Sequence, residues 1–555
     1  MESIADHPAT LDRPVAADSP PASAPFLSTR PLLALWVLAG ALLFVGLGAS
    51  PVKRSQEARV LETAREMLGA GWRNWLIPHA NGIERLHKPP LAYWLTAIAY
   101  KIAGVSLTAG RAPTALAGWF TLLLTFLAAR WLFGVRAAFF AAAALLGSYM
   151  FFHFSHLAET DPLATLFVTA SVYWFWKAAG RESASGGRAP PGAKYLHLGA
   201  AAMGLAVLAK GPPALYAALF LVSLAATSRR WDLLRRFLTS GAIVTFAVVA
   251  LPWFAYVHAT VGLTRIQDEA EVVLLGRDHK APVYDYFAYF FIMPAPWSAF
   301  VGLGVYEAAR RCTRDPRLRG VLLWAGATFV PLLLIPQRQL HYLNTLMPPL
   351  MILVGWLIDR GLRPDEDPGL RRAVRLVLAI TIIASFAGGP AVLWGAKTNL
   401  GHIRPTDWAF AVAVVAAFAA ILWICRTRGL LAGAFAYAAA AAACVTIAYG
   451  IWGPTLERAS WDTVAAAIRQ ETAARPAIYY GSGVNLRLCF YLRSTIRIVG
   501  SPAEVAQALT QDPRTVVVVL ERQKHKDLGL PEGLQKRGQS MHVDEEVVEV
   551  YRAGE

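Results

Sequence analysis

Charged side chains are scarce in this sequence. Asp, Glu, Lys and Arg together make up 16% of the 555 residues, whereas 56% of the residues are hydrophobic. Soluble domains carry about 25% charged residues, so the composition argues against an ordinary soluble protein and predicts an α-helical polytopic membrane protein. The 18 Trp, 18 Tyr and 26 Phe fit this class, because aromatic rings anchor helices at the two lipid–water interfaces.

Cysteine is also rare, and nucleotide-binding patterns are missing. Three of the four Cys residues lie in or beside apolar runs, so neither a disulfide framework nor a CxxC metal site is available. Residues 455–555 contain neither a GxGxxG sequence nor a P-loop. The net charge is +16, yet Lys and Arg stand in short clusters between apolar runs. We therefore attribute the charge to membrane topology and expect no nucleic-acid partner.

Thirteen apolar runs are the expected membrane spans, since a helix needs roughly 20 apolar residues to cross the hydrocarbon. The runs are 31–50, 112–133, 136–153, 161–180, 195–209, 212–227, 237–258, 286–306, 319–336, 342–360, 371–395, 408–425 and 430–452. A further run, 90–105, is short, begins with Pro90 and contains Lys101. If this run does not cross, nearly every basic cluster falls on one side, as the positive-inside rule requires. We therefore place the N-terminus in the cytoplasm and predict that 90–105 lies along the outer interface.

Two basic residues break this rule. Lys53 and Arg54 directly follow the first span and would lie on the outer side. Each needs a local anionic partner if the topology is right, so these two residues test the prediction.

Composition divides the chain into three parts. Residues 1–30 are rich in Pro, Ala and Ser and are expected to form a disordered cytoplasmic tail. Residues 31–453 are expected to form the transmembrane domain, with the loop 51–111 on its outer side. Residues 454–555 predict a soluble α/β domain on the same outer face. Its expected strands are 477–482, 488–494, 496–500, 514–522 and 545–552, and its expected helices are 461–474 and 501–511.

Ionisable residues gather in five segments that this topology places on the outer face. Such residues at the ends of spans are costly unless they face a polar cavity, so the topology predicts one cavity that opens outward. The segments are the loop 51–89, "HFSHLAETDP" (153–162), "LAKGPP" with Lys210, the loop 259–285, and "PQRQLH" (336–341) with Arg338.

The first of these segments contains the stretch "SQEARVLETAREML", which predicts an amphipathic helix. Val60, Leu61, Ala64 and Met67 share one helical face, whereas Glu62 lies off it. We expect a helix lying on the membrane, with Glu57 and Arg59 in its first turn. An ordinary solvated interfacial helix with self-neutralising charge pairs is the alternative.

The sequence "NGIERLHKPPLAYW" is more specific. Lys88 precedes two prolines, which hold the backbone extended and fix the direction of the ammonium group. A fixed ammonium at a lipid interface suits a lipid-linked phosphate, whereas the alternative is a lysine that only anchors a surface helix.

The sequence "HFSHLAETDP" offers four side chains that suit a divalent metal. These are His153, His156, Glu159 and Asp161. The alternatives are ordinary interfacial histidines and an Asp161 that caps the following helix before Pro162. A divalent metal is thus left open, and no other cofactor is expected.

These segments together resemble a known family. "QEARVLETAREMLGAGWRNWLIPHANGIERLHKPPLAYW", followed by "DP" at the start of a later span, "LAKG" and "HKAPVYDY", is similar to protein O-mannosyltransferase-related glycosyltransferases of the GT-C fold. The order and spacing of the motifs most resemble the bacterial aminoarabinose transferases that modify lipid A. The resemblance implies a multi-pass enzyme of the bacterial inner membrane. It also implies transfer of a sugar from a polyprenyl-phosphate donor, of the undecaprenyl phosphate type, to an acceptor on the periplasmic side.

The resemblance also carries over individual residues. Glu57 and Arg59 match the first motif, Lys88 matches the lysine before the prolines, and Asp161 and Lys210 match later turns. On this basis Glu57 and Asp161 are the expected catalytic carboxylates, and Arg59, Lys88 and Lys210 the expected ligands of the donor phosphate. The resemblance also makes 51–111 the expected periplasmic catalytic loop.

Two positions depart from the family, and a third motif adds candidates. Gln56 stands where relatives usually carry Asp, and His87 where they carry Glu. In "GRDHKAPVYDY", His279, Lys280 and Pro282 match a later loop of the family. Gln56, His87, His279 and Lys280 therefore join Arg338 as cavity candidates.

The expected chemistry agrees with these residues. Breaking the bond from C1 of the sugar to the phosphate places negative charge on the leaving group, which Lys88, Arg59 or Lys210 could stabilise. A hydroxyl acceptor needs a general base, whereas a phosphate acceptor such as lipid A is already anionic. Because the acid is missing at Gln56, we favour a phosphate acceptor.

Three alternatives remain from the sequence. A serine or threonine of an exported protein could be the acceptor. A transporter of lipids or polar solutes would show two related halves, and no such internal repeat is visible. A relative that only binds a lipid-linked sugar is the third.

Overall fold

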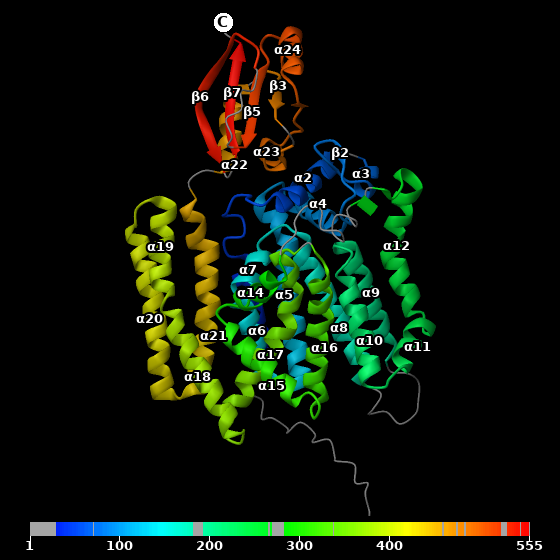
Figure 1. Cartoon of the computed structure of the whole chain (residues 1–555), viewed down its shortest axis with the longest axis vertical. Helices are drawn as coiled ribbons and strands as arrows, with labels where there is room; N and C mark the ends of the chain where they lie inside the picture. The colour runs from blue at the N-terminus through cyan, green and yellow to red at the C-terminus, as the bar shows by residue number, and fades with distance from the viewer. Residues whose placement is uncertain are drawn as a thin grey trace, which may run out of the picture.

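A bundle of long helices carries an α/β domain on one of its ends (Figure 1). The computed structural model describes residues 29–69, 71–180, 192–264, 267–268, 282–336, 338–457, 460–472, 475–481, 484–522, 530–543 and 546–553. Most of the predicted tail 1–30 lies outside these residues. The last short helix at the end of the bundle, η4, spans Gly453–Leu456, and the first helix of the sheet domain, α22, spans Trp461–Thr472.

Each of the thirteen predicted spans corresponds to one helix or to two consecutive helices. The helices are α1 (Thr29–Phe44), α5 (Leu107–Phe133), α6 (Val135–Leu146), α7 (Tyr149–Ser155), α8 (Thr160–Gly180), α9 (Ala193–Ala209), α10 (Ala214–Thr227), α11 (Asp232–Thr239), α12 (Ala242–Val261), α14 (Val283–Ile292), α15 (Ser298–Arg311), α16 (Pro316–Leu334), η2 (Leu340–Leu346), α17 (Met347–Gly361), α18 (Pro368–Ser385), α19 (Gly388–Leu400), α20 (Pro405–Arg428), α21 (Leu430–Ile447), η3 (Ala448–Trp452) and η4 (Gly453–Leu456). Among the described residues, seven helices are long and apolar enough to cross a membrane alone, or eight if the bent pair α6–α7 is one span. The polytopic helical class is thus confirmed, and the number thirteen stays a prediction.

Helix α17 forms the centre of the bundle. It is apolar on all sides, as a helix surrounded by other helices must be, and all its residues except Arg360 are buried. Close contact with α6 depends on Gly355, where a Cβ atom would lie 2.2 Å from the carbonyl oxygen of Ala137. Small residues at such crossings let helix backbones approach, which is how helices associate within lipid.

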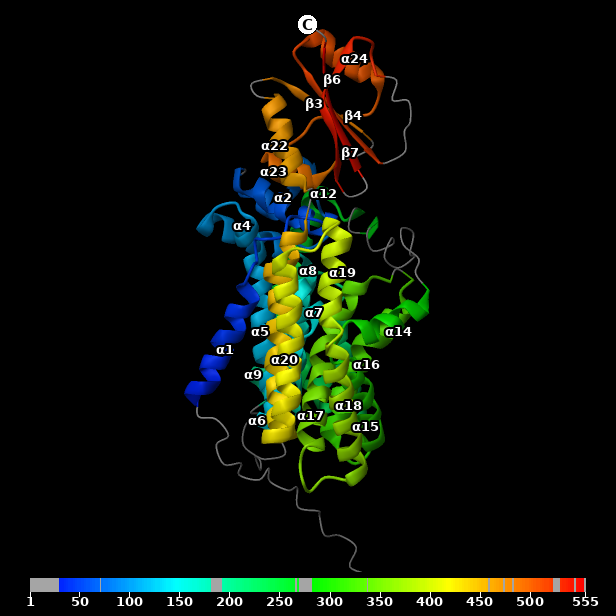
Figure 2. The ribbon, with the colours of Figure 1, turned by 90° about the vertical axis from the view of Figure 1, so that its left-hand side faces the viewer.

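A layer of short elements lies across the end of the bundle below the α/β domain (Figure 2). It consists of α2 (Ser55–Gly69), α3 (Arg73–Leu76), the hairpin of β1 (His79–Ala80) and β2 (Ile83–Glu84), and α4 (Leu91–Ala103). The structure therefore contains the helix expected at 55–68 and lays the segment 90–105 across the bundle end.

The buried face of α2 is wider than its periodicity indicates. Val60, Leu61, Ala64 and Met67 are buried as predicted, yet Glu62 is buried as well. The reason is tertiary, because the C-terminal domain covers the second side of α2 and the Arg65 guanidinium donates two hydrogen bonds to Glu62.

Lys53 and Arg54 have the anionic partners that the topology requires. The Lys53 ammonium lies 3.0 Å from a carboxylate oxygen of Glu457, and Arg54 forms an ion pair with the buried Glu159. These two ion pairs remove the conflict with the positive-inside rule.

The C-terminal domain is a five-stranded mixed sheet with helices on both faces. The strand order is β4-β3-β5-β7-β6, with β3 parallel to β4 and β5 and the other pairs antiparallel. The strands are β3 (Ala477–Tyr480), β4 (Ile498–Val499), β5 (Val516–Arg522), β6 (Leu534–Val543) and β7 (Glu546–Ala553), and the helices are α22 (Trp461–Thr472), α23 (Leu486–Leu492) and α24 (Pro502–Gln511). The valine run of β5 explains this layering, because Val516 and Val518 face one helical layer and Val517 and Val519 the other.

One prediction for this domain is wrong, and one strand was missed. The segment 488–494, expected as a strand, forms most of α23, because Asn485 caps a helix start and the apolar side of that helix packs on α2. The strand β6 was not predicted, because its sequence "LQKRGQSMHV" is mostly polar, as an edge strand allows.

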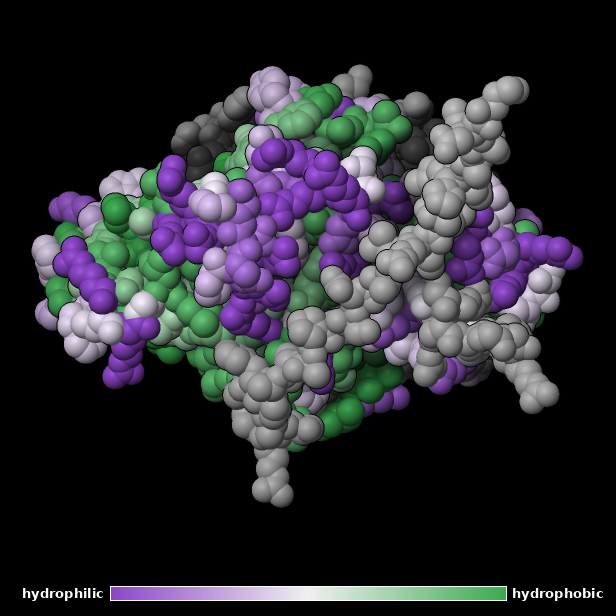
Figure 3. All heavy atoms as spheres, turned by 90° about the horizontal axis from the view of Figure 1, so that it is seen from below, coloured by the Kyte–Doolittle hydropathy of each residue, from purple (hydrophilic) through white to green (hydrophobic). Residues whose placement is uncertain are grey.

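The opposite end of the bundle is the more basic one. Viewed from that side, hydrophilic side chains gather around its middle, with hydrophobic side chains beside them (Figure 3). Several of its arginines form ion pairs, among them Arg136 with Asp359 and Arg311 with Glu366. The structure thus separates a paired basic end from the end that carries α2 and α4.

Candidate active site

Three of the predicted site residues line one small cavity at the α2–α4 end of the bundle. The cavity has a volume of about 40 Å³. It is lined by Lys88, Asp161, Lys210, Pro212, Pro213, Tyr216, Leu332, Ile335, Tyr342 and Thr345. Lys88, Asp161 and Lys210 come from separate turns of the chain, so these turns converge on one site.

Local sequence explains how each charge reaches the cavity. Asp161 lies in the first turn of α8, where the helix dipole favours a carboxylate. Lys210 ends α9, and Gly211 with a φ of 90° turns the chain into α10. Lys88 directly precedes the buried pair Pro89–Pro90 that leads into α4.

Asp161 and Lys210 form a buried ion pair. The Lys210 Nζ lies 2.5 Å from Asp161 Oδ1, and the side chains are 10% and 5% exposed, respectively. The same ammonium lies 4.3 Å from the centre of the Tyr342 ring, which adds a cation–π contact. These contacts fix the position of the Lys210 charge at the cavity wall.

The second oxygen of Asp161 has no hydrogen-bond donor among the described residues. Oδ2 is buried, and His341 Nε2 lies 4.0 Å from it, beyond hydrogen-bond distance. Buried carboxylate oxygens normally accept hydrogen bonds, so this atom is free to accept one from a ligand or from water.

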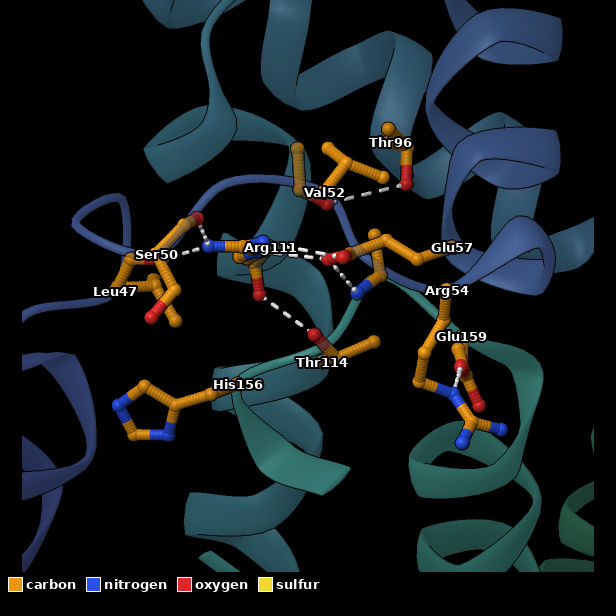
Figure 4. A network of polar contacts seen from close by, with 12 residues as sticks. Leu47, Ser50, Val52, Arg54, Glu57, Thr96, Arg111, Thr114, His156 and Glu159 are labelled. Carbon is orange, nitrogen blue, oxygen red and sulfur yellow. Dashed lines mark hydrogen bonds and ion pairs between the residues drawn. The ribbon is translucent and has the colours of Figure 1, made fainter. Parts of the chain in front are cut away.

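Glu57, the other expected catalytic carboxylate, has a different position. It is fully buried and accepts hydrogen bonds from Arg111 at 2.7 and 3.1 Å and from the Ala158 amide at 3.1 Å (Figure 4). Arg111 also donates to the carbonyl oxygens of Leu47 and Ser50. Both carboxylate oxygens of Glu57 are thus engaged in joining α2 to α5 and to the α7–α8 turn, away from the cavity lining.

Glu159 is a second buried carboxylate near the cavity. It lies in the turn before α8 and pairs with Arg54 (Figure 4). Burial, opposed by the charge of Arg54, raises the pKa of Glu159 to about 7.

The structure contradicts the metal set proposed from "HFSHLAETDP". No three His, Cys, Asp or Glu side chains within the described ranges are grouped so that they could hold a metal ion. The His156 ring contacts the carbonyl oxygens of Phe152 and Val45, while Glu159 and Asp161 pair with Arg54 and Lys210. The spacing in sequence is misleading, because the fold gives each of the four side chains other partners, including His153, whose ring packs against those of Tyr149 and Tyr449.

The other candidates lie apart from this lining or outside the described residues. Arg59 is exposed on α2, and Gln56 and His87 are half-buried. Arg338 donates a hydrogen bond to the carbonyl oxygen of Leu333. His279 and Lys280 lie outside the residues that the structure describes, and Pro282 directly precedes α14.

Sequence reasoning missed three residues of this region. Tyr216 and Tyr342 line the cavity, and aromatic residues in apolar helices give no signal of that kind. Arg111 could have been found, because an arginine within the apolar helix α5 needs a buried partner.

Comparison with known proteins supports the predicted resemblance. A family model described as dolichyl-phosphate-mannose-protein mannosyltransferase matches residues 87–256, a region that contains Lys88, Asp161 and Lys210. The structure also superimposes on ArnT from Cupriavidus metallidurans bound to undecaprenyl phosphate, with a TM-score of 0.75 and 24% identity. That match covers 94% of this chain and 98% of the other, so it extends into the C-terminal domain. This chain has the GT-C fold.

Curated relatives of this GT-C protein are aminoarabinose transferases. The chain is 28% identical over 354 residues to the undecaprenyl phosphate-α-4-amino-4-deoxy-L-arabinose arabinosyl transferase of Edwardsiella ictaluri, and the alignment covers 61% of each chain. It is 26% identical over 392 residues to a similarly named transferase of Proteus mirabilis, covering 66% of this chain and 65% of the relative. The match thus spans about three fifths of the length of these relatives. The resemblance recognised in the sequence is confirmed.

Proposed function

We propose that this chain is a glycosyltransferase that moves a sugar from a polyprenyl-phosphate donor, of the undecaprenyl phosphate type, to a phosphate of lipid A. The convergence of Lys88, Lys210 and Asp161 on one cavity is the observation that carries this proposal. The names of the curated relatives, and the undecaprenyl phosphate bound to the ArnT structure, support the choice of donor.

In this proposal the cavity end of the bundle faces the periplasm. The α2–α4 layer and the C-terminal domain then lie outside the inner membrane, and the basic end with Arg136 and Arg311 lies in the cytoplasm. This orientation agrees with the positive-inside rule once Lys53 and Arg54 are paired as described.

The chemistry follows from the charges in the cavity. The bond between C1 of the sugar and the donor phosphate breaks, and a new bond forms between C1 and an oxygen of the acceptor phosphate. The departing polyprenyl phosphate carries the negative charge, which Lys88 and Lys210 stabilise. Asp161 holds Lys210 in place through Oδ1 and offers Oδ2 to a hydroxyl group of the sugar.

A phosphate acceptor needs no general base, and the residues at positions 56 and 57 offer no carboxylate that is free to act as one. Gln56 replaces the family acid, and both oxygens of Glu57 are occupied by Arg111 and the Ala158 amide. Asp161 is therefore the carboxylate that we assign to the substrate, and Glu57 is assigned a positioning role.

The test reconstitutes the purified protein in vesicles with undecaprenyl-phosphate-linked aminoarabinose. Lipid A and an exported polypeptide are offered in parallel, and mass spectrometry detects the added sugar. We expect the mass of lipid A to increase, and we expect Lys88→Ala and Lys210→Ala to abolish the increase, while the matched exposed-lysine control Lys397→Ala retains it. Sugar on the polypeptide alone would replace lipid A by a protein acceptor, the outcome that the name of the family model favours. No transfer to either acceptor would refute the proposal.

A further inference from the structure

A second, much larger cavity lies within the bundle on the side of α1. Its volume is about 620 Å³, within the range of about 300–1,000 Å³ that ligand sites occupy. Helices α1, α5, α6 and α21 form its walls. Figure 2 shows α1 leaning away from the other helices toward the end opposite the C-terminal domain. The lining residues place the cavity between α1 and the helices α5, α6 and α21.

The lining of this cavity, which we call the α1 groove, is almost wholly apolar. Leucine and aromatic side chains of α1 and α5 form one part, and alanines of α6 and α21 form the other, among them Ala143 and Ala439. Arg130 is the single charged residue among the described residues that line it. Arg130 is exposed and makes no ion pair within the described part of the chain, unlike Arg136 and Arg317 nearby in sequence or at the same end.

The position of Arg130 gives the groove a direction. Arg130 lies in the last turn of α5, at the end of the bundle opposite α2 and α4. On α1 the lining runs from Leu32 to Leu42, which is about 15 Å at the helical rise of about 1.5 Å per residue. That length is about half of the roughly 30 Å hydrocarbon core, so the groove spans one leaflet, with its cation at the membrane surface.

A further polar atom lies in the groove. The indole Nε1 of Trp36 is buried and has no hydrogen-bond acceptor among the described residues, although Trp36 itself lines the groove and stacks on Trp119 at 4.2 Å. An acceptor from a ligand would satisfy this N–H, as buried polar groups require. The ester carbonyl of a glycerophospholipid sits just below its phosphate and has this chemistry.

We propose that the α1 groove binds one acyl chain of an anionic glycerophospholipid from the leaflet opposite the C-terminal domain, with the lipid phosphate on Arg130. The positive charge of Arg130 and the length of the groove, about one leaflet, favour this lipid. A polyprenyl phosphate with its phosphate on Arg130 would hold that group at the wrong end of the bundle for the cavity with Lys88. Basic sites between helices at the cytoplasmic surface are known to hold anionic headgroups.

The experiment measures lipid that stays bound to the protein. The full chain is reconstituted in vesicles of phosphatidylglycerol and phosphatidylcholine, where the phosphatidylglycerol carries a photoreactive acyl chain, and crosslinked peptides are identified by mass spectrometry. We expect crosslinks in α1, α5, α6 and α21. We expect Arg130→Ala to reduce retained phosphatidylglycerol about fivefold, the effect of one basic residue at an anionic surface, and Arg130→Lys to preserve it.

Matched variants distinguish a specific lipid-binding site from nonspecific contact with membrane lipids. Ala439→Phe fills the groove from an exposed position and should abolish the crosslinks, whereas Ala416→Phe, exposed on α20 outside the groove, should not. Arg372→Ala, exposed at the same end, is the control for charge. Equal retention of photoreactive phosphatidylcholine, or no effect of Arg130→Ala in a protein with unchanged thermal unfolding, would overturn the proposal. Displacement of phosphatidylglycerol by added undecaprenyl phosphate would also overturn it, because the groove would then belong to the donor.

Discussion

The ion pair between Lys210 and Asp161 can be tested for its role by removing each charge singly and then both together. The pair is buried, with side chains 10% and 5% exposed and a separation of 2.5 Å. Removing one member of a buried pair typically costs about 3–5 kcal/mol, because the remaining charge has lost its partner. We therefore expect Lys210→Met and Asp161→Asn each to lower the free energy of unfolding by an amount of this order.

The double variant Lys210→Met/Asp161→Asn distinguishes structure from function. It leaves no unpaired charge, so most of the lost stability should return, as happens when buried ion pairs are replaced by neutral residues. Activity should not return, because the leaving phosphate has lost one of its cations. The loss of one such electrostatic contact costs about 10²–10³ in kcat.

The assay combines thermal unfolding in detergent with the sugar-transfer measurement described above. Stability is read first, and the rate is then compared at a temperature where all variants are folded. Recovery of both stability and transfer in the double variant would refute the reasoning, since the pair would then only hold α8 to α9. Loss of stability in the double variant beyond either single variant would refute the assumption that the two charges compensate each other.

Three further predictions follow from other contacts. Glu57→Gln should lower stability by about 3 kcal/mol or more because it weakens the fully buried pair with Arg111, and the rate per folded molecule should change much less, as measured by thermal unfolding and by transfer normalised to folded protein. Burial raises the pKa of Glu62 from 4.5 to about 7, so the protonated carboxyl group stabilises the folded state below about pH 4.5, and this contribution is lost as the pH rises through about 7. The midpoints of thermal unfolding at pH 5 and pH 8 should therefore differ more for the wild type than for Glu62→Gln. An equal difference in the two proteins would contradict this. Gln56→Asp should leave the rate of transfer to a phosphate acceptor unchanged and should allow transfer to a hydroxyl acceptor, which the wild type does not use. If the wild type itself transfers sugar only to hydroxyl acceptors, the predicted preference for phosphate is wrong.

The charges at the cavity were predictable from the sequence because each stands beside a residue that fixes its backbone. Lys88 precedes two prolines, Asp161 precedes Pro162, and Lys210 precedes a glycine and two prolines. Short motifs of this kind position a side chain through local geometry, so the sequence already contains the information. The turns need only meet at the same end of the bundle, which the positive-inside rule decides.

Contacts between distant segments were not predictable in the same way. Nothing in the sequence of α2 indicates that α23 covers its second side, yet this contact buries Glu62 and makes a helix of a segment expected as a strand. The metal set failed for a related reason, because its members contact distant segments of the chain instead of one another: His156 contacts Val45, Glu159 pairs with Arg54, and Asp161 pairs with Lys210.

The charge cluster after the first span connects separate parts of the molecule. Lys53 pairs with Glu457 at the start of the C-terminal domain, Arg54 pairs with Glu159 before α8, and Glu57 pairs with Arg111 in α5. The backbone of the same loop is held by α23, since the Val52 amide donates to Tyr491 and Arg487 donates to the carbonyl oxygen of Lys53. These five contacts, made by six consecutive residues, reach four separate parts of the chain and hold the loop in place. Because Glu159 lies two residues before Asp161, these contacts link the C-terminal domain, through Lys53 and Arg54, to the segment that carries Asp161. Since the described lining of the cavity contains no residue of this domain, we expect the domain to affect the cavity only through these contacts.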